Sequence, residues 1–272
     1  MPELPEVETQ IRDLQILIGR KILEISSNTR KSFTPKFSEF QKKIRNKKIL
    51  AIYRRGKFLI FTLEGDSKLV IHFRMTGHFL FAKNFTPLEK SIRHFFKLNG
   101  GIILQFSDIR KFGTLKFFEK NEKISELEKL GIEPLSRDFT LKKFREILKN
   151  RRGKLKSFLL NQTFIGGIGN IYADEICFAS RLYPAVQVEK LNDTEIKKLH
   201  TAIRAELTKG VRNHGTTIGE YVDIYGQEGR NQFSLFAYRR FGQPCKVCGT
   251  KLKKIKINQR TTSFCPKCQL QK

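Results

Sequence analysis

The chain opens with Met1-Pro2-Glu3, and its second residue could act as a nucleophile. If Met1 is removed, the mature chain begins with the secondary amine of Pro2, which can attack an electrophilic carbon and form an iminium ion. The iminium is an electron sink that activates an adjacent C–H bond for elimination. Glu3 stands beside the amine as a proton donor and acceptor. On position alone, the alternative is an ordinary N-terminus ahead of a capped surface helix.

Four cysteines form two pairs near the other end of the chain, Cys245-x2-Cys248 and Cys265-x2-Cys268. This spacing is typical of a tetrahedral four-thiolate zinc site built on two knuckles. Four protein thiolates leave no position for water, so we expect one structural zinc ion. The lysine-rich residues between the pairs predict a β-hairpin that presents Arg260 to a phosphate or a groove. A solvated charged face is the alternative for this hairpin.

Two glycine-containing segments have the composition of phosphate-binding turns. The run Arg-Arg-Gly-Lys at 54–57 is basic, and its central glycine suits close approach to a phosphate. The run Gly-Gly-Ile-Gly-Asn at 166–170 leads into a predicted helix and would expose backbone N–H groups to an anion. A charged turn and a simple turn, respectively, are the alternatives.

Two further segments carry residues that could probe a base pair. Alternation predicts that His72, Arg74 and Thr76 lie on one face of a strand, with Met75 near its end. Arg110 and Phe112 are two residues apart, so on a strand they would share a face. Neither pattern is specific by itself.

Composition narrows the class of partner. The 272 residues include 53 Lys and Arg against 26 Asp and Glu, a net charge of +27 and a pI near 10.1. Such a balance favours a polyanion, most often nucleic acid, over lysine-rich codon bias or a membrane surface. No signal-peptide pattern and no apolar run of about 18 residues is present, so we expect no membrane association and a cytoplasmic location near the nucleoid.

Short β-rich runs separated by turn signals recur between about residues 21 and 120. Asn99-Gly100-Gly101 between two apolar runs is a hairpin signal. Many short strands at this spacing predict an antiparallel sandwich or barrel. The expected strands are Ile22–Ser26, Ile49–Tyr53, Phe58–Leu63, Leu69–Phe73, Phe79–Phe81, His94–Leu98, Ile102–Phe106 and Thr114–Phe118.

Helical periodicity appears at the N-terminus and again after about Gly131. The first helix is predicted from the apolar spacing of Leu4, Val7, Ile11, Leu14, Leu17 and Ile18, with Pro5 in its first turn. The stretch 215–230 is glycine-rich and weakly periodic, so we predict a mobile loop there. The other expected helices span 138–150, 170–181 with Asn170 as cap, and 192–213 with a capping box at its start.

The octet Met1–Glu8 closely resembles the start of the formamidopyrimidine-DNA glycosylase (Fpg, MutM) family. Further motifs match along nearly the whole chain, at 71–77, 108–113, 166–175 and 258–266. One departure is Arg239, which stands where many members have a glycine ahead of the zinc module, so the local turn and any contact made there are in question.

The resemblance implies an α+β fold in three parts. Residues 1–130 would form an N-terminal antiparallel β-sandwich that carries the N-terminal helix. Residues 131–236 would form a helix-two-turns-helix DNA-binding domain, and 237–272 a four-cysteine zinc finger with a β-hairpin. A monomer would bind double-stranded DNA containing oxidised bases in a basic cleft.

The resemblance also implies a bifunctional DNA glycosylase and AP lyase of base excision repair. Such an enzyme excises 8-oxoguanine and formamidopyrimidines through a Schiff base on the N-terminal proline, followed by β- and δ-elimination. It needs no redox cofactor. One alternative is an endonuclease VIII-like glycosylase for oxidised pyrimidines. The other is a non-catalytic zinc-ribbon protein that binds damaged DNA.

Carried over residue by residue, the family pattern assigns roles to two groups. Met75, Arg110 and Phe112 would fill the duplex after base extrusion, Lys156 would serve lesion recognition, and Asn170 would clamp the backbone. The loop 215–230 would cover the flipped base. The catalytic set is Pro2, Glu3, Lys57 and Arg260, and the DNA-binding set is Glu6, His72, Met75, Arg110, Phe112, Lys156 and Asn170.

Overall fold

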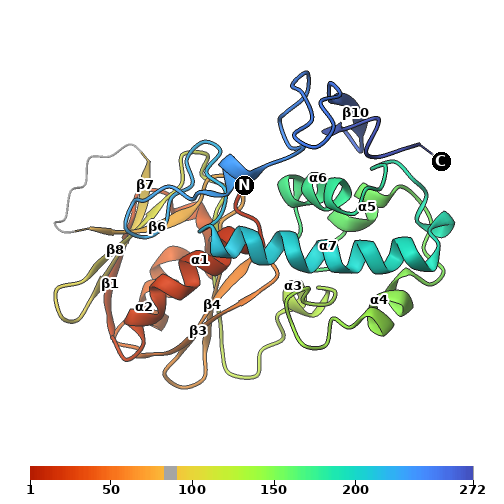
Figure 1. Cartoon of the computed structure of the whole chain (residues 1–272). Coiled ribbons are helices and arrows are strands. Elements are labelled where there is room, and N and C mark those ends of the chain that lie inside the picture. Colours follow the sequence, from red (N-terminus) through yellow and green to blue (C-terminus); the bar gives the residue numbers. More distant parts are fainter. Residues whose placement is uncertain (83–90, 272) are drawn as a thin grey trace. The chain divides into compact units, whose positions relative to one another are not determined.

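The computed structural model describes residues 1–82 and 91–271, and the chain divides into two compact units (Figure 1). Unit 1 comprises Met1–Glu128 and Asn213–Gln232. Unit 2 comprises Lys129–Arg212 and Phe233–Lys272. The division into three domains at 130 and 236 stays a prediction. The fold class is confirmed, because unit 1 is built on β-sheets and unit 2 on helices with a C-terminal hairpin.

Unit 1 contains two β-sheets whose strands pair antiparallel, except for one short parallel pair between β2 and β9. The four-stranded sheet has the order β1 (Ile22–Ser27), β7 (Ile92–Leu98), β8 (Ile103–Ser107) and β6 (His78–Ala82). The five-stranded sheet has the order β2 (Phe33–Thr34), β9 (Thr114–Phe118), β5 (Lys68–His72), β4 (Phe58–Leu63) and β3 (Ile49–Arg55). All eight expected strands are present.

Phenylalanines hold the two sheets together. Phe79 on β6 contacts Phe61 on β4 of the other sheet, with ring centroids 6.4 Å apart, and Phe106 on β8 of its own sheet, with centroids 5.3 Å apart. Each of the three rings is at most 3 % exposed. Edge-to-face rings of this kind add specific geometry to the area they bury. The buried residues of both sheets thus belong to one core.

Helix α1 (Leu4–Leu14) continues as a 3-10 helix over Gln15–Leu17 and lies against β3 and β4 (Figure 1). Its buried face joins the core between the sheets, as the apolar spacing predicts. Ile18, expected on that face, is instead 43 % exposed. Gln10 fixes the other side of α1, because its side chain both donates to the Phe79 carbonyl and accepts the Phe79 N–H.

The sequence analysis missed helix α2 (Phe37–Ile44). Its Phe40 and Ile44 are fully buried, at a helical spacing of four residues. The signal was therefore present, but eight residues after a proline make a short pattern. Unit 1 also contains a 3-10 turn over Arg30–Ser32 and the short helix α3 (Ser125–Glu128).

Unit 2 is built from helices α4 (Leu141–Leu148), α5 (Leu155–Leu160), α6 (Asn170–Ala179) and α7 (Asp193–Arg212). Helix α6 packs against both α5 and α7 (Figure 1). The predicted capping box opens α7, because Asn192 and Glu195 exchange hydrogen bonds at 3.0 and 2.9 Å. Asn170 is the first residue of α6 rather than its cap, which is Gly169. None of the helices within 1–82 and 91–271 has the length and hydropathy to cross a bilayer.

Candidate active site and nucleic-acid interface

The candidate nucleophile lies at the start of α1. Pro2 is buried, and Glu3 is the N-cap residue of the helix with only 2 % of its surface exposed. Glu3 and Glu6 form a capping box in which the Glu6 carboxylate accepts the Glu3 N–H at 2.8 Å. These two bonds satisfy backbone N–H groups at the start of α1 and fix the path of the chain that enters the helix. Pro5 in the first turn is compatible with this geometry.

Glu6 also binds the loop that the sequence predicts to cover the flipped base. Its second carboxylate oxygen accepts the Thr216 N–H at 2.7 Å, and the Tyr221 hydroxyl donates to the Glu6 carbonyl at 3.2 Å. Gly215 adopts φ +82°, and a Cβ there would lie 2.9 Å from Glu6 Cγ. The loop is therefore packed tightly against α1 at this end. Ile224 anchors it again in the core of the unit.

Glu6 is only 1 % exposed, and both of its carboxylate oxygens accept backbone N–H groups. The role of Glu6 in DNA binding stays a prediction. In the structure, this side chain joins the N-terminal segment to the 215–230 loop.

Lys57 lies in the two-residue turn between β3 and β4, after Gly56 with φ +58°. A glycine at the first position of such a turn gives the twist that a tight hairpin needs. Arg54 holds this turn against α1, because its guanidinium donates to the Gly56 carbonyl at 3.0 Å and to Glu8 at 3.1 Å. Arg54 thus serves the fold. Lys57 is 7 % exposed and lies near His72.

The expectation that His72, Arg74 and Thr76 share one face of a strand is wrong. Strand β5 ends at His72, and Arg74 adopts φ +54°, a left-handed conformation that a strand cannot accommodate. His72 Nδ1 accepts the Arg74 N–H at 2.9 Å and so shapes the turn. Burial, reinforced by the charges of Arg74 and Lys57, lowers the pKa of His72 to about 3. The ring is therefore neutral near pH 7, and its hydrogen lies on Nε2.

Arg110 and Phe112 also lie outside the strands, between β8 and β9. Lys111 between them adopts φ +58°, so the alternation of a strand does not apply. The Arg110 guanidinium instead lies over the Phe112 ring, 4.9 Å from its centroid. Phe112 is 51 % exposed and Met75 is 38 % exposed. All three predicted probes are thus on exposed turns.

In unit 2, Asn170 begins α6 after the predicted glycine turn. The turn is braced by Gln162, whose side chain accepts the Gly167 N–H and donates to the Ile168 carbonyl. The Asn170 oxygen Oδ1 is buried and has no hydrogen-bond partner among the described residues. A buried polar atom left unsatisfied in this way is uncommon in a folded protein.

Lys156 does not reach a surface in this structure. Its side chain is 0 % exposed, and its ammonium lies 2.5 Å from Asp174, which is also buried. The ammonium donates to Thr262 Oγ1 at 2.8 Å as well. The role of Lys156 in lesion recognition stays a prediction. In the structure, the Lys156–Asp174 pair and the bond to Thr262 join α5, α6 and strand β11 (Arg260–Phe264).

Arg260 is exposed at the start of β11 (Arg260–Phe264), which pairs with β10 (Lys253–Ile257) as the sequence predicts. Asn258 in the turn donates to Ser157 Oγ on α5 at 2.9 Å. The tip of the hairpin is therefore tied to the helices of unit 2, and the position of Arg260 is set by contacts about 100 residues away in sequence.

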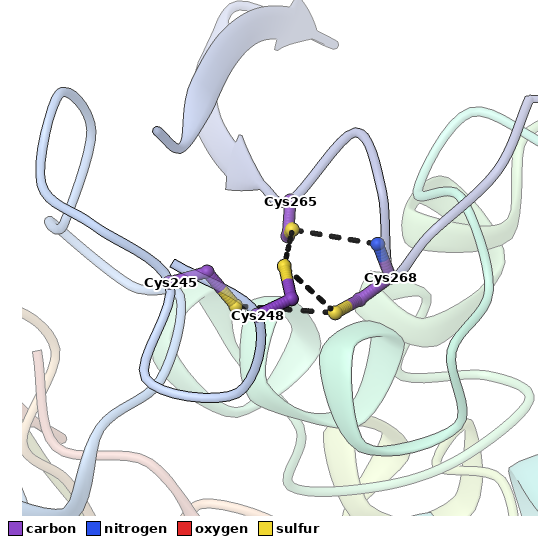
Figure 2. A group of neighbouring side chains, drawn as sticks. All are labelled: Cys245, Cys248, Cys265 and Cys268. Atoms are coloured by element: carbon purple, nitrogen blue, oxygen red, sulfur yellow. Dashed lines mark hydrogen bonds between the residues drawn. The ribbon is translucent and has the colours of Figure 1, made fainter. Parts of the chain in front are cut away.

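The four cysteines converge at the base of this hairpin, and Figure 2 shows their sulfur atoms turned toward one another. Neighbouring sulfur atoms lie 3.4, 3.5 and 3.9 Å apart, and all four lie within 4.8 Å of one another. A tetrahedron with Zn–S bonds of about 2.3 Å has S–S edges of about 3.8 Å. The arrangement fits one structural zinc ion held by Cys245, Cys248, Cys265 and Cys268.

Comparison with protein-family models defines the class of protein. The chain matches the formamidopyrimidine-DNA glycosylase N-terminal domain over 1–115 and the formamidopyrimidine-DNA glycosylase H2TH domain over 130–221. It also matches the zinc finger found in FPG and IleRS over 242–270. The three models follow one another along the chain and define its class as a DNA glycosylase with a zinc finger.

Full-length relatives give the particular family. The chain is 40 % identical over 275 residues to the formamidopyrimidine-DNA glycosylase of Ligilactobacillus salivarius, covering 100 % of both chains. The structure superposes with a TM-score of 0.93 on a Lactococcus lactis FPG mutant bound to DNA containing Fapy-dG, at 36 % identity, covering 99 % of this chain and 100 % of that one. The Lactococcus lactis Fpg bound to abasic-site DNA gives 0.92 at 35 % identity, with the same coverage. The chain belongs to the formamidopyrimidine-DNA glycosylase family.

The sequence analysis missed several residues that shape the site. Arg54 and Glu8 form an ion pair that holds the turn with Lys57. The Thr216 N–H donates to the Glu6 carboxylate, and Asp174 forms an ion pair with Lys156. None of these pairings has a local signal, because the partners are between 18 and 210 residues apart. The acidic residue Glu175, which accepts the N–H groups of 236–238, was missed for the same reason.

Proposed function

We propose that this chain is a bifunctional DNA glycosylase and AP lyase that excises oxidised purines from double-stranded DNA. The substrates would be 8-oxoguanine and formamidopyrimidines. Family membership supports the glycosylase class, and the capping box that fixes Glu3 and the residues before it supports the position of the nucleophile. The observation that carries the proposal is this buried Pro2–Glu3 start of α1 in a chain that matches the family along its full length.

The proposed reaction begins after removal of Met1. The Pro2 nitrogen bonds to C1′ of the sugar while the glycosidic bond breaks and its electron pair leaves with the base. Glu3 gives a proton to the departing base and takes up the N–H proton that the Pro2 nitrogen loses. Glu3 protonates the sugar ring oxygen as the ring opens, and the product is an iminium ion. Loss of a 2′ proton then expels the 3′ phosphate, and a second elimination expels the 5′ phosphate. A one-nucleoside gap remains.

The other predicted residues would hold the DNA. Lys57, Asn170 and Arg260 would contact phosphates, and the Nε2–H of neutral His72 could donate to another. Met75, Arg110 and Phe112 would occupy the space of the extruded base, which offsets part of the unstacking cost. The net charge of +27 favours binding to any duplex before the lesion is found. We also propose a monomer that works in the cytoplasm on the nucleoid.

Borohydride trapping would test the proposal. The protein is incubated with an 8-oxoguanine:cytosine duplex, the iminium is reduced, and the cross-linked peptide is mapped. A cross-link at Pro2 would establish the nucleophile, the lyase chemistry and the loss of Met1 together. Binding without a cross-link, on this duplex and on one with a ready-made abasic site, would favour a non-catalytic damage-binding protein. Stronger excision from a thymine glycol duplex would favour the endonuclease VIII-like alternative.

Glu3→Gln tests the acid role. The amide cannot give up a proton, so base release in single-turnover assays should fall by about 10²- to 10⁴-fold. DNA affinity should stay close to that of the wild type, because the side chain is buried at the helix start. Full turnover by the variant would remove Glu3 from the mechanism. Glu24→Gln, at an exposed position of β1, is the matched control.

A further inference from the structure

Two exposed turns of unit 1 carry the three residues predicted to enter the duplex, and they are bonded directly to each other. Thr76 lies in the turn with Met75, and Asp108 opens the segment with Arg110. The Thr76 hydroxyl donates to Asp108 Oδ1 and accepts the Arg110 N–H at 3.1 Å. One threonine side chain therefore bridges two segments that are 32 residues apart in sequence.

Asp108 organises its own turn with its remaining groups. Its second carboxylate oxygen accepts the Gly113 N–H at 2.7 Å, and its carbonyl accepts the Lys111 N–H at 3.2 Å. Arg93 also donates to this carbonyl, at 2.8 Å. The aspartate is 1 % exposed, so it presents no surface to a DNA strand and acts through the residues it holds.

Both turns also rest on the same aromatic ring. A Cβ placed on Gly77 would lie 2.9 Å from the Phe106 ring, and one placed on Gly113 would lie 2.7 Å from it. The absence of a side chain at these two positions lets both backbones approach Phe106, which is fully buried. The two hydrogen bonds of the Thr76 hydroxyl also join the turns directly. The two turns are thus fixed to each other as well as to the core.

We propose that Thr76 and Asp108 are positioning residues that hold Met75, Arg110 and Phe112 as one preformed wedge for base extrusion. The inference rests on the proposed function. A wedge replaces the stacking of an extruded base only if its parts enter the duplex together. Turns that are already ordered lose little conformational freedom on insertion, whereas loose turns would have to be ordered at that moment.

The proposal separates two kinds of substrate. Excision of a base from a duplex requires the wedge, because the target must leave the helix. Reaction with a single-stranded oligonucleotide that carries a ready-made abasic site requires the nucleophile but no extrusion. Loss of the bridge should therefore slow the first reaction and spare the second. A general defect in folding or in the nucleophile would slow both.

The test uses Thr76→Val, which keeps the shape of the side chain and removes its hydroxyl. Leaving the buried Asp108 oxygen and the Arg110 N–H without this partner should reduce single-turnover excision of 8-oxoguanine from a duplex by about tenfold or more. Borohydride trapping on the single-stranded abasic oligonucleotide should stay within about twofold of the wild type, as expected for a change that acts only before the chemical step. Thr76→Ser, which keeps the hydroxyl, should excise 8-oxoguanine from the duplex at a rate close to that of the wild type.

Equal duplex excision by Thr76→Val and wild type would overturn the proposal, and so would an equal loss on both substrates. If Thr76→Val does not fold, Asp108→Ala provides the second test, because alanine can accept neither the Thr76 hydroxyl nor the Gly113 N–H. The same selective loss supports the proposal, and unchanged duplex excision overturns it. A wild-type protein that fails to react with both substrates would instead remove the proposed function itself.

Discussion

Two buried carboxylates, one in each unit, hold functional segments in different ways. Glu6 in unit 1 accepts two neutral backbone N–H groups and joins the N-terminal segment to the 215–230 loop. Asp174 in unit 2 pairs with the Lys156 ammonium and also accepts the Ser263 N–H at 3.3 Å. Each carboxylate is 1 % exposed. The first anchor loses hydrogen bonds when it is changed, whereas the second leaves an uncompensated charge.

The desolvation cost is visible at Asp174. Burial raises the pKa of this carboxyl to about 7, although the Lys156 ammonium and the Ser263 N–H act in the opposite direction. The ion pair therefore offsets only part of the cost of burying its members. The pair connects α5 and α6 to strand β11, which begins with Arg260. The two anchors thus predict different responses to mutation.

The largest effect is expected for Lys156→Met, which keeps the length of the side chain and leaves Asp174 buried without its partner. The free energy of unfolding should fall by about 3–5 kcal/mol in urea titrations. The double variant Lys156→Met/Asp174→Leu should recover most of the loss, because neither charge remains. It should also recover excision if Lys156 acts through the hairpin. A double variant that is as stable as the wild type but does not excise 8-oxoguanine would instead support direct lesion recognition by Lys156.

A smaller effect is expected for Glu6→Gln in unit 1. The amide keeps one acceptor but turns an NH2 group toward an N–H donor, so one charge-assisted hydrogen bond is lost, at a cost of about 1.5–3 kcal/mol. Urea unfolding measures this cost, and hydrogen exchange at Thr216 reports whether the loop is released. Glu24→Gln again serves as the control. A loss as large as that of Lys156→Met would contradict the difference between the two anchors.

A third buried group, His94, contrasts with both because it is buried without charge. Burial lowers its pKa to about 3, whereas the unfolded side chain titrates near 6.5. Between pH 6.5 and pH 3 the unfolded chain therefore binds a proton at His94 that the folded chain does not bind. The stability is fully present above pH 6.5 and decreases as the pH falls below that value. Between pH 7.5 and pH 5 this group should reduce the free energy of unfolding by about 2 kcal/mol.

The measurement is the pH dependence of urea unfolding in wild type and in His94→Phe. The variant should lose this part of the dependence, because Phe33 and Phe106 already surround the ring and accept an aromatic side chain. The neutral His72, which has a similarly lowered pKa, contributes equally to both proteins and cancels in the difference. Identical slopes in the two proteins would contradict a neutral His94.

The smallest effect concerns Arg239, the departure from the family pattern. A turn is present here, because the Arg240 N–H donates to the Ala237 carbonyl at 3.0 Å. Arg239 adopts φ +58° in it, a left-handed conformation that costs about 1–2 kcal/mol for a residue with a Cβ. Arg239→Gly should therefore stabilise the protein by about 1 kcal/mol in urea unfolding. Arg239→Ala is the control, because it keeps the strain and removes the charge. Equal stability of the glycine and alanine variants would show that the conformation is not strained.

Local patterns predicted the elements well and the turns poorly. The short β-rich runs between turn signals located all eight expected strands, and the Asn192/Glu195 box located the start of α7. The turns at Arg74 and Lys111 were read as strand, because non-glycine residues with positive φ carry no clear sequence signal. Met75 and Phe112 are exposed on these turns, and their insertion into the duplex stays a prediction.

The sequence by itself determined the features that depend on near neighbours. The proline at position 2, the two cysteine pairs and the helical spacing of α1 lie within short segments, and their chemistry follows from residue type and separation. Only the tertiary structure decided how Glu6, Lys156 and Asp108 are used. Their partners are up to 210 residues away, and whether a charge is exposed or enclosed depends on packing that no local pattern encodes.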